Sequence, residues 1–254
     1  MRHDEHVRLM KQLCAHLDAG TDVDAGGLRQ LDTTVYTDPA RAEQERLEFF
    51  MSTPQCVGMS GDLAEPGSFL THDDRPLPAE ERHGLLFGHP DPDGQMNLDE
   101  LLGEWFNDEF PTWHFGDMIP INRDAYDTAC NWKLAMDTFG ETYHFSALHK
   151  NTLFNSFHGN VQCYDQEGHL HRMVLCRREI DEMRMLPEDP WVAQNFAEII
   201  RDEDYLMGES QQRAANAGSL DQIIFGRNEP ALHHYHQTYA SKLGDAPIPL
   251  LDAI

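Results

Sequence analysis

The stretch NWKLAMDTFGETYHFSALH, which ends at His149, crowds histidines, acids and aromatic residues into a short run. On a helix, Asp137, Glu141 and His144 share one face because they are spaced four and three residues apart. His149 lies about 140° further round an ideal helix than His144. The two imidazoles therefore converge only if the helix ends or loosens near Ser146. The stretch allows a metal site at a helix end but does not require one.

Two neutral imidazoles and one carboxylate, with other coordination positions open, are the ligand set of non-haem Fe(II) sites that react with oxygen. A third ligand must come from elsewhere, and the segment RDEDYLMGESQQ is the best source. On the apolar stripe of the helix expected there, Glu203 lies near the centre and Asp204 at the edge. A buried carboxylate is costly unless it is paired or binds a metal. Helical angle alone does not choose between the two acids, and it slightly favours Glu203.

Both histidine clusters also have ordinary explanations. Histidines near an acid are most often exposed side chains or side chains with satisfied hydrogen bonds. In the stretch ALHHYH, His233 and His236 lie one turn apart and either bind a metal or belong to a polar helix face. Spacing alone leaves these alternatives open.

Composition restricts the class of protein. The chain has 254 residues, 40% of them hydrophobic, which indicates a globular fold of one large or two small domains. Forty-four acids against 19 Lys and Arg give a formal charge of −25, which disfavours nucleic-acid and membrane-surface partners. No apolar run approaches the roughly 20 residues that span a bilayer, and we find no secretion signal. Five scattered cysteines without a CxxC motif are typical of reduced thiols in the cytoplasm.

The hydrophobic pattern predicts more helix than strand. Helices are expected at 4–17, 37–50, 97–106, 133–145, 193–217 and 228–243, and strands at 84–90, 160–164 and 169–178. Gly218 and Gly244 follow the last two helices at the position where glycine commonly ends a helix. A Pro- and Gly-rich charged segment, residues 63–84, is the clearest boundary. We therefore predict an α+β fold in which helices pack around a reduced antiparallel sheet.

The stretch that begins at Asn131 resembles the iron-binding segment of the Rieske non-haem iron oxygenases, the alpha subunits of aromatic-ring-hydroxylating dioxygenases and related monooxygenases. The family pattern is Asn-Trp-Lys, an acid, Tyr-His, and a second His after four more residues. The matching residues here are Asn131, Trp132, Lys133, Glu141, Tyr143, His144 and His149. EDYLMGESQ resembles a later family segment through Asp204, Glu209 and Gln212. FGRNEPALHHYH and VYTDPARAEQE are similar to the family's C-terminal helix and N-terminal arm.

The resemblance implies a ligand set and a reaction. His144, His149 and Asp204 would bind Fe(II), so the resemblance selects Asp204 over Glu203. Glu141 would take the place of a carboxylate that links a ligand histidine to the Rieske cluster of a neighbouring subunit. A glutamate there is similar to the branch that oxidises quaternary-ammonium compounds. The family reaction is O2-dependent hydroxylation of an aromatic or other small organic substrate, with electrons from a reductase, in a helix-grip catalytic domain that commonly forms trimers.

The sequence departs from the family at two places. CxH and CxxH motifs hold the family's [2Fe–2S] cluster, but this sequence contains no CxxH, and its one CxH, at Cys14, lies outside the expected place. We therefore predict that the Rieske domain is missing between an N-terminal helical arm and linker, residues 1–75, and an iron-binding catalytic domain, residues 76–254. Several strands that would wall the substrate pocket are also expected to be missing after Trp191.

Two functions follow from these observations. The first is an iron oxygenase domain, for which we expect iron binding more firmly than turnover because the chain has no cluster to supply the second electron. The second is a non-enzymatic, regulatory or remnant paralogue that binds iron or assembles with a full-length oxygenase subunit. A separate protein that carries the cluster would restore turnover in the first case.

Overall fold

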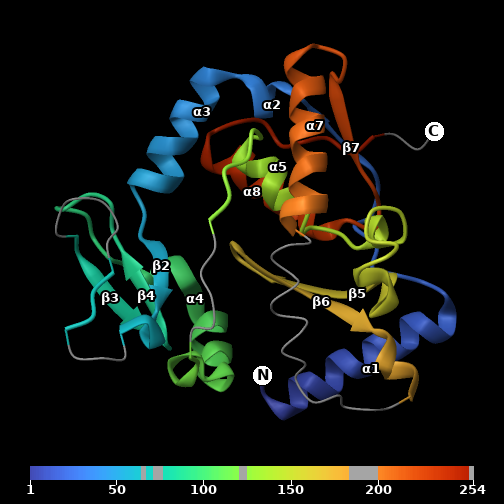
Figure 1. Ribbon diagram of the computed structural model, residues 1–254, viewed down its shortest axis with the longest axis horizontal. Coiled ribbons are helices and arrows are strands. Elements are labelled where there is room, and N and C mark those ends of the chain that lie inside the picture. Colours follow the sequence, from blue (N-terminus) through green and yellow to red (C-terminus); the bar gives the residue numbers. More distant parts are fainter. Residues whose placement is uncertain (64–66, 71–76, 120–124, 183–199, 252–254) are drawn as a thin grey trace. The chain divides into compact units, whose positions relative to one another are not determined.

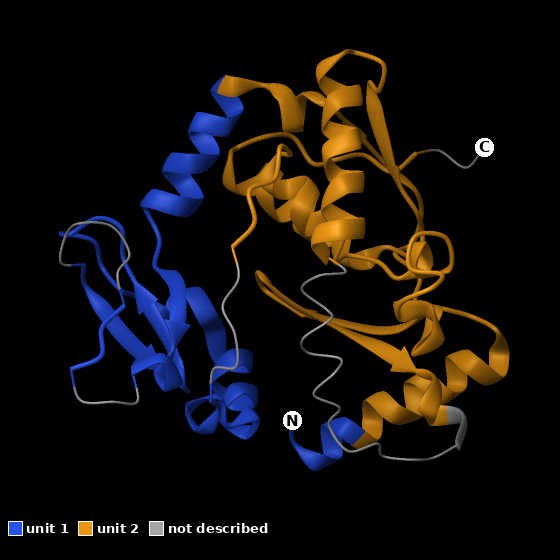
Figure 2. Cartoon of the chain, in the orientation of Figure 1, with its two compact units in different colours: residues 1–6, 40–123 blue, residues 7–39, 124–254 orange. Residues whose placement is uncertain are grey.

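The structure is a computed structural model of the 254-residue chain, and it describes residues 1–63, 67–70, 77–119, 125–182 and 200–251 (Figure 1). The chain divides into two compact units (Figure 2). Unit 1 contains residues 1–6 and 40–123, and unit 2 contains residues 7–39 and 124–254. These units are defined by spatial contacts, and the sequence-based division into residues 1–75 and 76–254 stays a prediction.

Unit 1 is a small α+β unit whose sheet is antiparallel, with the strand order β2-β4-β3. Its strands are β2 (Gln55–Met59), β3 (Ala79–Arg82) and β4 (Leu85–Gly88), and its helical segments are α3 (Pro39–Glu45), η1 (Arg46–Met51), η2 (Ser60–Leu63), α4 (Leu98–Glu109), η3 (Phe110–Trp113) and η4 (Phe115–Asp117). The Arg82 guanidinium joins the sheet to α4 because it lies 2.7 Å from a Glu80 oxygen and 2.5 Å from an Asp99 oxygen. The helices predicted at 37–50 and 97–106 and the strand at 84–90 are confirmed, whereas β3 lies inside the predicted linker.

In the described part of unit 2, two separate two-stranded antiparallel sheets are formed, β1-β7 and β5-β6. The strands are β1 (Arg29–Asp32), β5 (Phe157–Glu167), β6 (Leu170–Arg177) and β7 (Gln222–Phe225). The α-helices are α1 (His3–Ala19), which enters the unit at Val7, α2 (Thr34–Thr37), α5 (Trp132–Asp137), α7 (Tyr205–Asn216) and α8 (Pro230–Lys242). Shorter helical turns are η5 (Tyr143–Ser146), η6 (Leu153–Asn155), η7 (Arg178–Glu182) and η8 (Ile200–Asp204).

The β5-β6 hairpin follows the prediction closely. Its turn contains Gly168, whose positive φ of 58° suits a residue without a Cβ. Helix α1 packs against the hairpin, since the Cys163 thiol of β5 lies 3.5 Å from the Leu9 carbonyl oxygen and both residues are buried. All five cysteines are free, as their spacing predicted.

The main core of unit 2 joins α2, α5, α8 and the β1-β7 sheet. Its buried members are Leu31, Tyr36, Leu134, Phe225, Leu232, Ala240 and Ile248. Helix α7 packs beside α2 and α5. Gly218 and Gly244 have positive φ after α7 and α8, so both predicted helix ends are confirmed. The first part of the helix predicted at 193–217 lies outside the described residues.

The predicted α+β class is confirmed, because helices pack with small antiparallel sheets. The helix predicted at 133–145 is wrong beyond Asp137, where α5 ends. The Thr138 hydroxyl donates to the Ala135 carbonyl at 2.8 Å, and Gly140 packs so closely on Leu232 that an added Cβ would lie 2.2 Å from a leucine methyl carbon. The chain must therefore turn between α5 and Glu141. None of the described helices is long and apolar enough to cross a membrane.

The packing at Gly140 generates a prediction about stability. Gly140→Ala should lower the free energy of unfolding by about 1–3 kcal/mol, because the added methyl displaces the buried Leu232 side chain. The matched control is Gly208→Ala in α7, where the Cβ would meet the Cys130 sulfur at an ordinary 3.6 Å. That variant should be unchanged or up to about 1 kcal/mol more stable, because alanine favours helix. Urea denaturation measures both, and equal effects would contradict the packing argument.

Candidate metal centre

A set of hydrogen bonds fastens α7 to the start of α5. Gln212 of α7 accepts from the Asn131 backbone N–H at 2.8 Å, and both side chains donate to the Tyr36 carbonyl, at 3.2 and 3.1 Å. Glu209, one turn earlier, accepts from the Ala129 N–H at 3.0 Å. The two α7 residues that match the family pattern downstream of Asp204 thus hold backbone groups immediately before α5. This clamp aligns the segment that contains Asp204 with the segment that contains the histidines.

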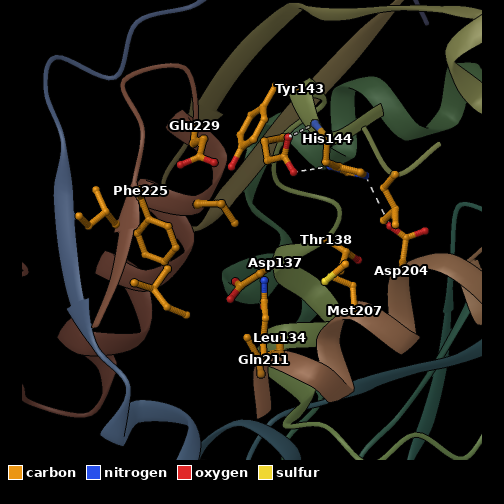
Figure 3. Close-up of a pocket in the computed structure, with 15 residues that line it drawn as sticks. Leu134, Asp137, Thr138, Tyr143, His144, Asp204, Met207, Gln211, Phe225 and Glu229 are labelled. Atoms are coloured by element: carbon orange, nitrogen blue, oxygen red, sulfur yellow. Dashed lines mark hydrogen bonds and ion pairs between the residues drawn. The ribbon is translucent and has the colours of Figure 1, made fainter. Parts of the chain in front are cut away.

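The histidines do not lie on one regular helix. His144 lies in the 3-10 turn η5, and His149 lies in the turns that follow it. Asp204 is the last residue of η8 and directly precedes α7. Its Oδ1 lies 3.5 Å from His144 Nε2 and 3.2 Å from His149 Nε2 (Figure 3 shows His144 and Asp204). One ligand atom from each residue lies within 4.8 Å of the others. The structure therefore brings together the three residues that the sequence selected.

Each imidazole has its own carboxylate on the opposite edge. Glu141 accepts from His144 Nδ1–H and, at 3.2 Å, from the His144 backbone N–H. Glu203 lies 2.5 Å from His149 Nδ1 and also accepts from the Thr152 hydroxyl at 3.2 Å. A carboxylate at one ring nitrogen fixes the tautomer and leaves the other nitrogen available. Both rings are thus oriented with Nε2 toward Asp204. Helical angle slightly favoured Glu203 as a metal ligand. In the structure Glu203 instead orients the imidazole of His149, which is itself a candidate ligand.

Burial and charge act together at this cluster. His149 and Asp204 are only 1% and 4% exposed. Burial acts to lower the pKa of His144, but the hydrogen bonds that it donates to Asp204 and Glu141 outweigh burial and raise that pKa to about 9. The pKa of His149 is also raised, because Asp204 and Glu203 outweigh burial. Burial opposes ionisation of Asp204, yet the two histidines keep its pKa below the usual value. Without a metal, the raised pKa values of the two imidazoles therefore favour positive charge beside the buried carboxylate.

The donor set fits a divalent transition metal. Metal–N and metal–O bonds of about 2.0–2.2 Å separate neighbouring ligand atoms by about 3.0–3.4 Å. The separations from Asp204 Oδ1 to His149 Nε2 and His144 Nε2, at 3.2 and 3.5 Å, are close to that range. Two nitrogens and one oxygen from the protein leave coordination positions open for small molecules.

Two cavities adjoin the cluster, and they differ in chemistry. The smaller, about 150 Å³, contacts all three of His144, His149 and Asp204. Its other walls are mainly apolar and come from Phe139, Phe145, Leu153, Met173, Leu175 and Ile200. The larger, about 190 Å³, contacts His144 and Asp204 but not His149, and no Lys or Arg is among the described residues that line it (Figure 3).

Four carboxylates line this larger, acidic cavity, namely Asp137, Glu141, Asp204 and Glu229. Sequence analysis did not single out Glu229. It is only 3% exposed and accepts hydrogen bonds from the Gly226 N–H and the Tyr143 hydroxyl. Burial raises the pKa of Glu229, and the charges of Glu141 and Asp137 raise it further. The sequence signal that could have identified Glu229 is an acid directly before Pro230, at the start of the last predicted helix.

His233 and His236, for which spacing left metal binding open as one alternative, have other surroundings in the structure. His236 Nε2 donates to Asp137 at 2.7 Å, and the Tyr36 hydroxyl donates to the other oxygen of that carboxylate at 2.8 Å. Among the described residues, only His144, His149 and Asp204 form a group of three or more potential ligands. His233 and His236 are both buried, so they do not lie on a solvated face of α8. A regular helix would place Asp137 beside His144. In the structure its carboxylate instead accepts hydrogen bonds from His236 and from Tyr36 of the core.

Comparison with known proteins agrees with this architecture. The sequence matches the family described as "Ring hydroxylating alpha subunit (catalytic domain)" at residues 115–192 and 170–245. These overlapping matches span just over half of the chain, and the chain belongs to this family of Rieske-type oxygenase alpha subunits. No match was found among proteins of curated function.

Solved structures similar to this chain include the quaternary ammonium Rieske monooxygenase CntA. CntA in complex with an inhibitor aligns with a TM-score of 0.69, and CntA in complex with its substrate L-carnitine aligns with 0.67. In both cases the identity is 14%, and the alignment covers 86% of this chain and 96% of CntA. At this identity the likeness establishes the fold.

The carboxylate on His149 generates a second prediction. Glu203→Gln should weaken binding of a divalent transition metal by about 10- to 100-fold, because the amide orients the imidazole less strongly than the carboxylate. Asp202→Asn is the matched control, since this neighbouring acid is exposed and pairs with Arg201. It removes the same charge and should leave the affinity unchanged. Anaerobic titration calorimetry measures both, and an equal loss in the two variants would show a general charge effect instead of orientation.

Proposed function

We propose that this chain is a catalytic domain that binds one Fe(II) through His144, His149 and Asp204 and supports O2-dependent oxidation of a small organic substrate. The observation that carries the proposal is the convergence of two imidazole Nε2 atoms on one buried carboxylate oxygen. Membership of the oxygenase family supports the same conclusion.

The residues of the chain have separate roles in this proposal. When bound, ferrous iron would supply the capacity to bind and activate O2. Glu141 and Glu203 hold the two imidazoles in the ligating orientation through their Nδ1–H groups. The apolar cavity reaches all three ligands, so it is the place for the substrate carbon that is oxidised. Its apolar walls exclude water from that carbon.

Electrons must come from another polypeptide in this proposal. The sequence has no CxxH motif to complete a Rieske cluster site. One of the similar structures, also of a quaternary ammonium Rieske monooxygenase, gives insight into inter-subunit electron transfer in that enzyme. We therefore propose that a cluster-bearing subunit, reduced by its own reductase, serves this chain within an oligomer, with a trimer as the family expectation. The cytoplasmic location also stays a prediction.

A small cation of the quaternary-ammonium type is the substrate class that the acidic cavity supports best. Among the described residues, four carboxylates and no Lys or Arg line it, together with the aromatic rings of Phe225 and Tyr143. Aromatic rings attract cations to their π faces. CntA, which has a similar fold, acts on L-carnitine. Glu141 supports the same substrate class, because a glutamate at this place in the family pattern resembles the branch that oxidises quaternary-ammonium compounds. A neutral aromatic substrate held in the apolar cavity is the alternative.

Iron content and turnover test the proposal together. Anaerobic Fe(II) titration should give about one iron per chain in the wild type and no high-affinity iron in His144→Ala. The control variant His16→Ala, which changes a histidine of α1 that contacts Thr21, should bind normally. Substrate hydroxylation should require added cluster-bearing subunit and reductase, whereas iron binding should not.

The outcomes separate the two functions. Wild-type stoichiometry near zero would contradict the iron site. Intact iron binding without turnover, together with a changed sedimentation or activity of a full-length oxygenase subunit on mixing, would instead support the regulatory or assembly role.

A matched ligand pair tests the substrate class. Choline should bind at least about 10-fold more tightly than 3,3-dimethyl-1-butanol, its neutral isostere, because carboxylates and aromatic faces stabilise the cation. Glu229→Gln should reduce this preference, whereas Glu167→Gln, at the exposed hairpin tip, should not. Competition calorimetry on the iron-loaded protein measures the ratio. Equal affinities for the two ligands would favour the neutral aromatic substrate.

A further inference from the structure

A second pair of histidines lies on the surface of unit 2, away from the residues described above. His171 belongs to β6 and His234 to α8. Their Nδ1 atoms are 3.3 Å apart, and the two ring planes are inclined by 82°. The pair therefore joins the β5-β6 hairpin to α8 through two side chains whose nitrogens face one another.

The hydrogen bonds of this pair define where its lone pairs lie. His234 Nε2–H donates to the Gly168 carbonyl at 3.0 Å, so the lone pair of this imidazole is on Nδ1. In the metal-free protein, His171 Nδ1–H donates to that lone pair. A backbone carbonyl that accepts from the distal nitrogen is the usual partner of a histidine that ligates a metal.

The surroundings keep His171 neutral. Desolvation and the neighbouring His234 lower the pKa of His171. The pKa of the nearby His169 is lowered as well, by burial, Lys242 and His234. Neutral imidazoles ligate metals, whereas protonated ones do not. The lowered pKa of His171 therefore favours the form that ligates a metal.

The separation of the two nitrogens matches a tetrahedral ion. Zn–N bonds of about 2.0–2.1 Å at a tetrahedral angle separate two nitrogens by about 3.3–3.4 Å. The observed distance of 3.3 Å between His171 Nδ1 and His234 Nδ1 needs no rearrangement of the backbone. The proton on His171 would move from Nδ1 to Nε2, which frees the second lone pair without loss of a proton.

We propose that His171 and His234 form a second metal site, which takes Zn2+ or a similar divalent ion with water in the remaining positions. The bound ion would link the β5-β6 hairpin to α8. Met173 and Leu175, which belong to β6 like His171, line the apolar cavity, so this link would also fix one wall of that cavity. This site does not depend on iron binding at His144.

Zinc titration of the untagged full-length chain tests the proposal. The His144→Ala background weakens the competing centre, and in it one zinc per chain should remain. Adding His171→Ala or His234→Ala should weaken that binding at least 10-fold, whereas adding His3→Ala, an exposed histidine of α1, should not. Zinc should also raise the melting temperature of the wild type by more than that of His171→Ala, so the test does not depend on whether His144→Ala folds.

Three results would overturn the proposal. The first is no zinc bound in the His144→Ala background while circular dichroism shows that this variant is folded. The second is binding that is equal with and without His171. The third is half a zinc per chain, which would mean that two copies of the chain share the ion.

Discussion

The structure of the site depends on one buried carboxylate, that of Asp204, which two imidazoles contact. A carboxylate that is 4% exposed would be costly if it were alone. The histidines that compensate it, His149 and His144, lie 55 and 60 residues earlier in the chain. The fold of unit 2 must therefore hold two distant segments in one register before any metal binds.

Helices α5 and α7 meet this requirement through polar contacts more than through apolar burial. Gln212 and Glu209 bind backbone N–H groups just before α5, and Gln212 and Asn131 share the Tyr36 carbonyl as acceptor. Since α7 begins directly after Asp204, any shift of α7 along its axis would break these bonds and displace the carboxylate together. The same residues thus specify both the packing and the site.

The sequence predicted the elements with strong local signals and missed those that tertiary packing decides. The β5-β6 hairpin, α1 and the glycine ends of α7 and α8 follow from local periodicity and turn chemistry. The break after Asp137 does not, because it results from contact between Gly140 and Leu232, which lie far apart in the chain. Strands β1 and β7 are four residues each and pair with one another although they lie about 190 residues apart in the chain, so neither has a local pattern of its own. The choice between Glu203 and Asp204 came from the resemblance, since their angles on an ideal helix do not separate them.

Consecutive residues contact opposite edges of the same ring, because Glu203 lies at Nδ1 of His149 and Asp204 at Nε2. The ring can neither flip nor tilt without breaking an ion pair, and it is 1% exposed. Its freedom is therefore lost when the chain folds, not when an ion arrives. A metal would meet a fully enclosed ring at His149 and a less enclosed one at His144, whose side chain is 16% exposed. The selectivity of the centre for ionic radius would then be set mainly by the His149 side, and ions that demand another ligand spacing would have to distort His144 to be accepted.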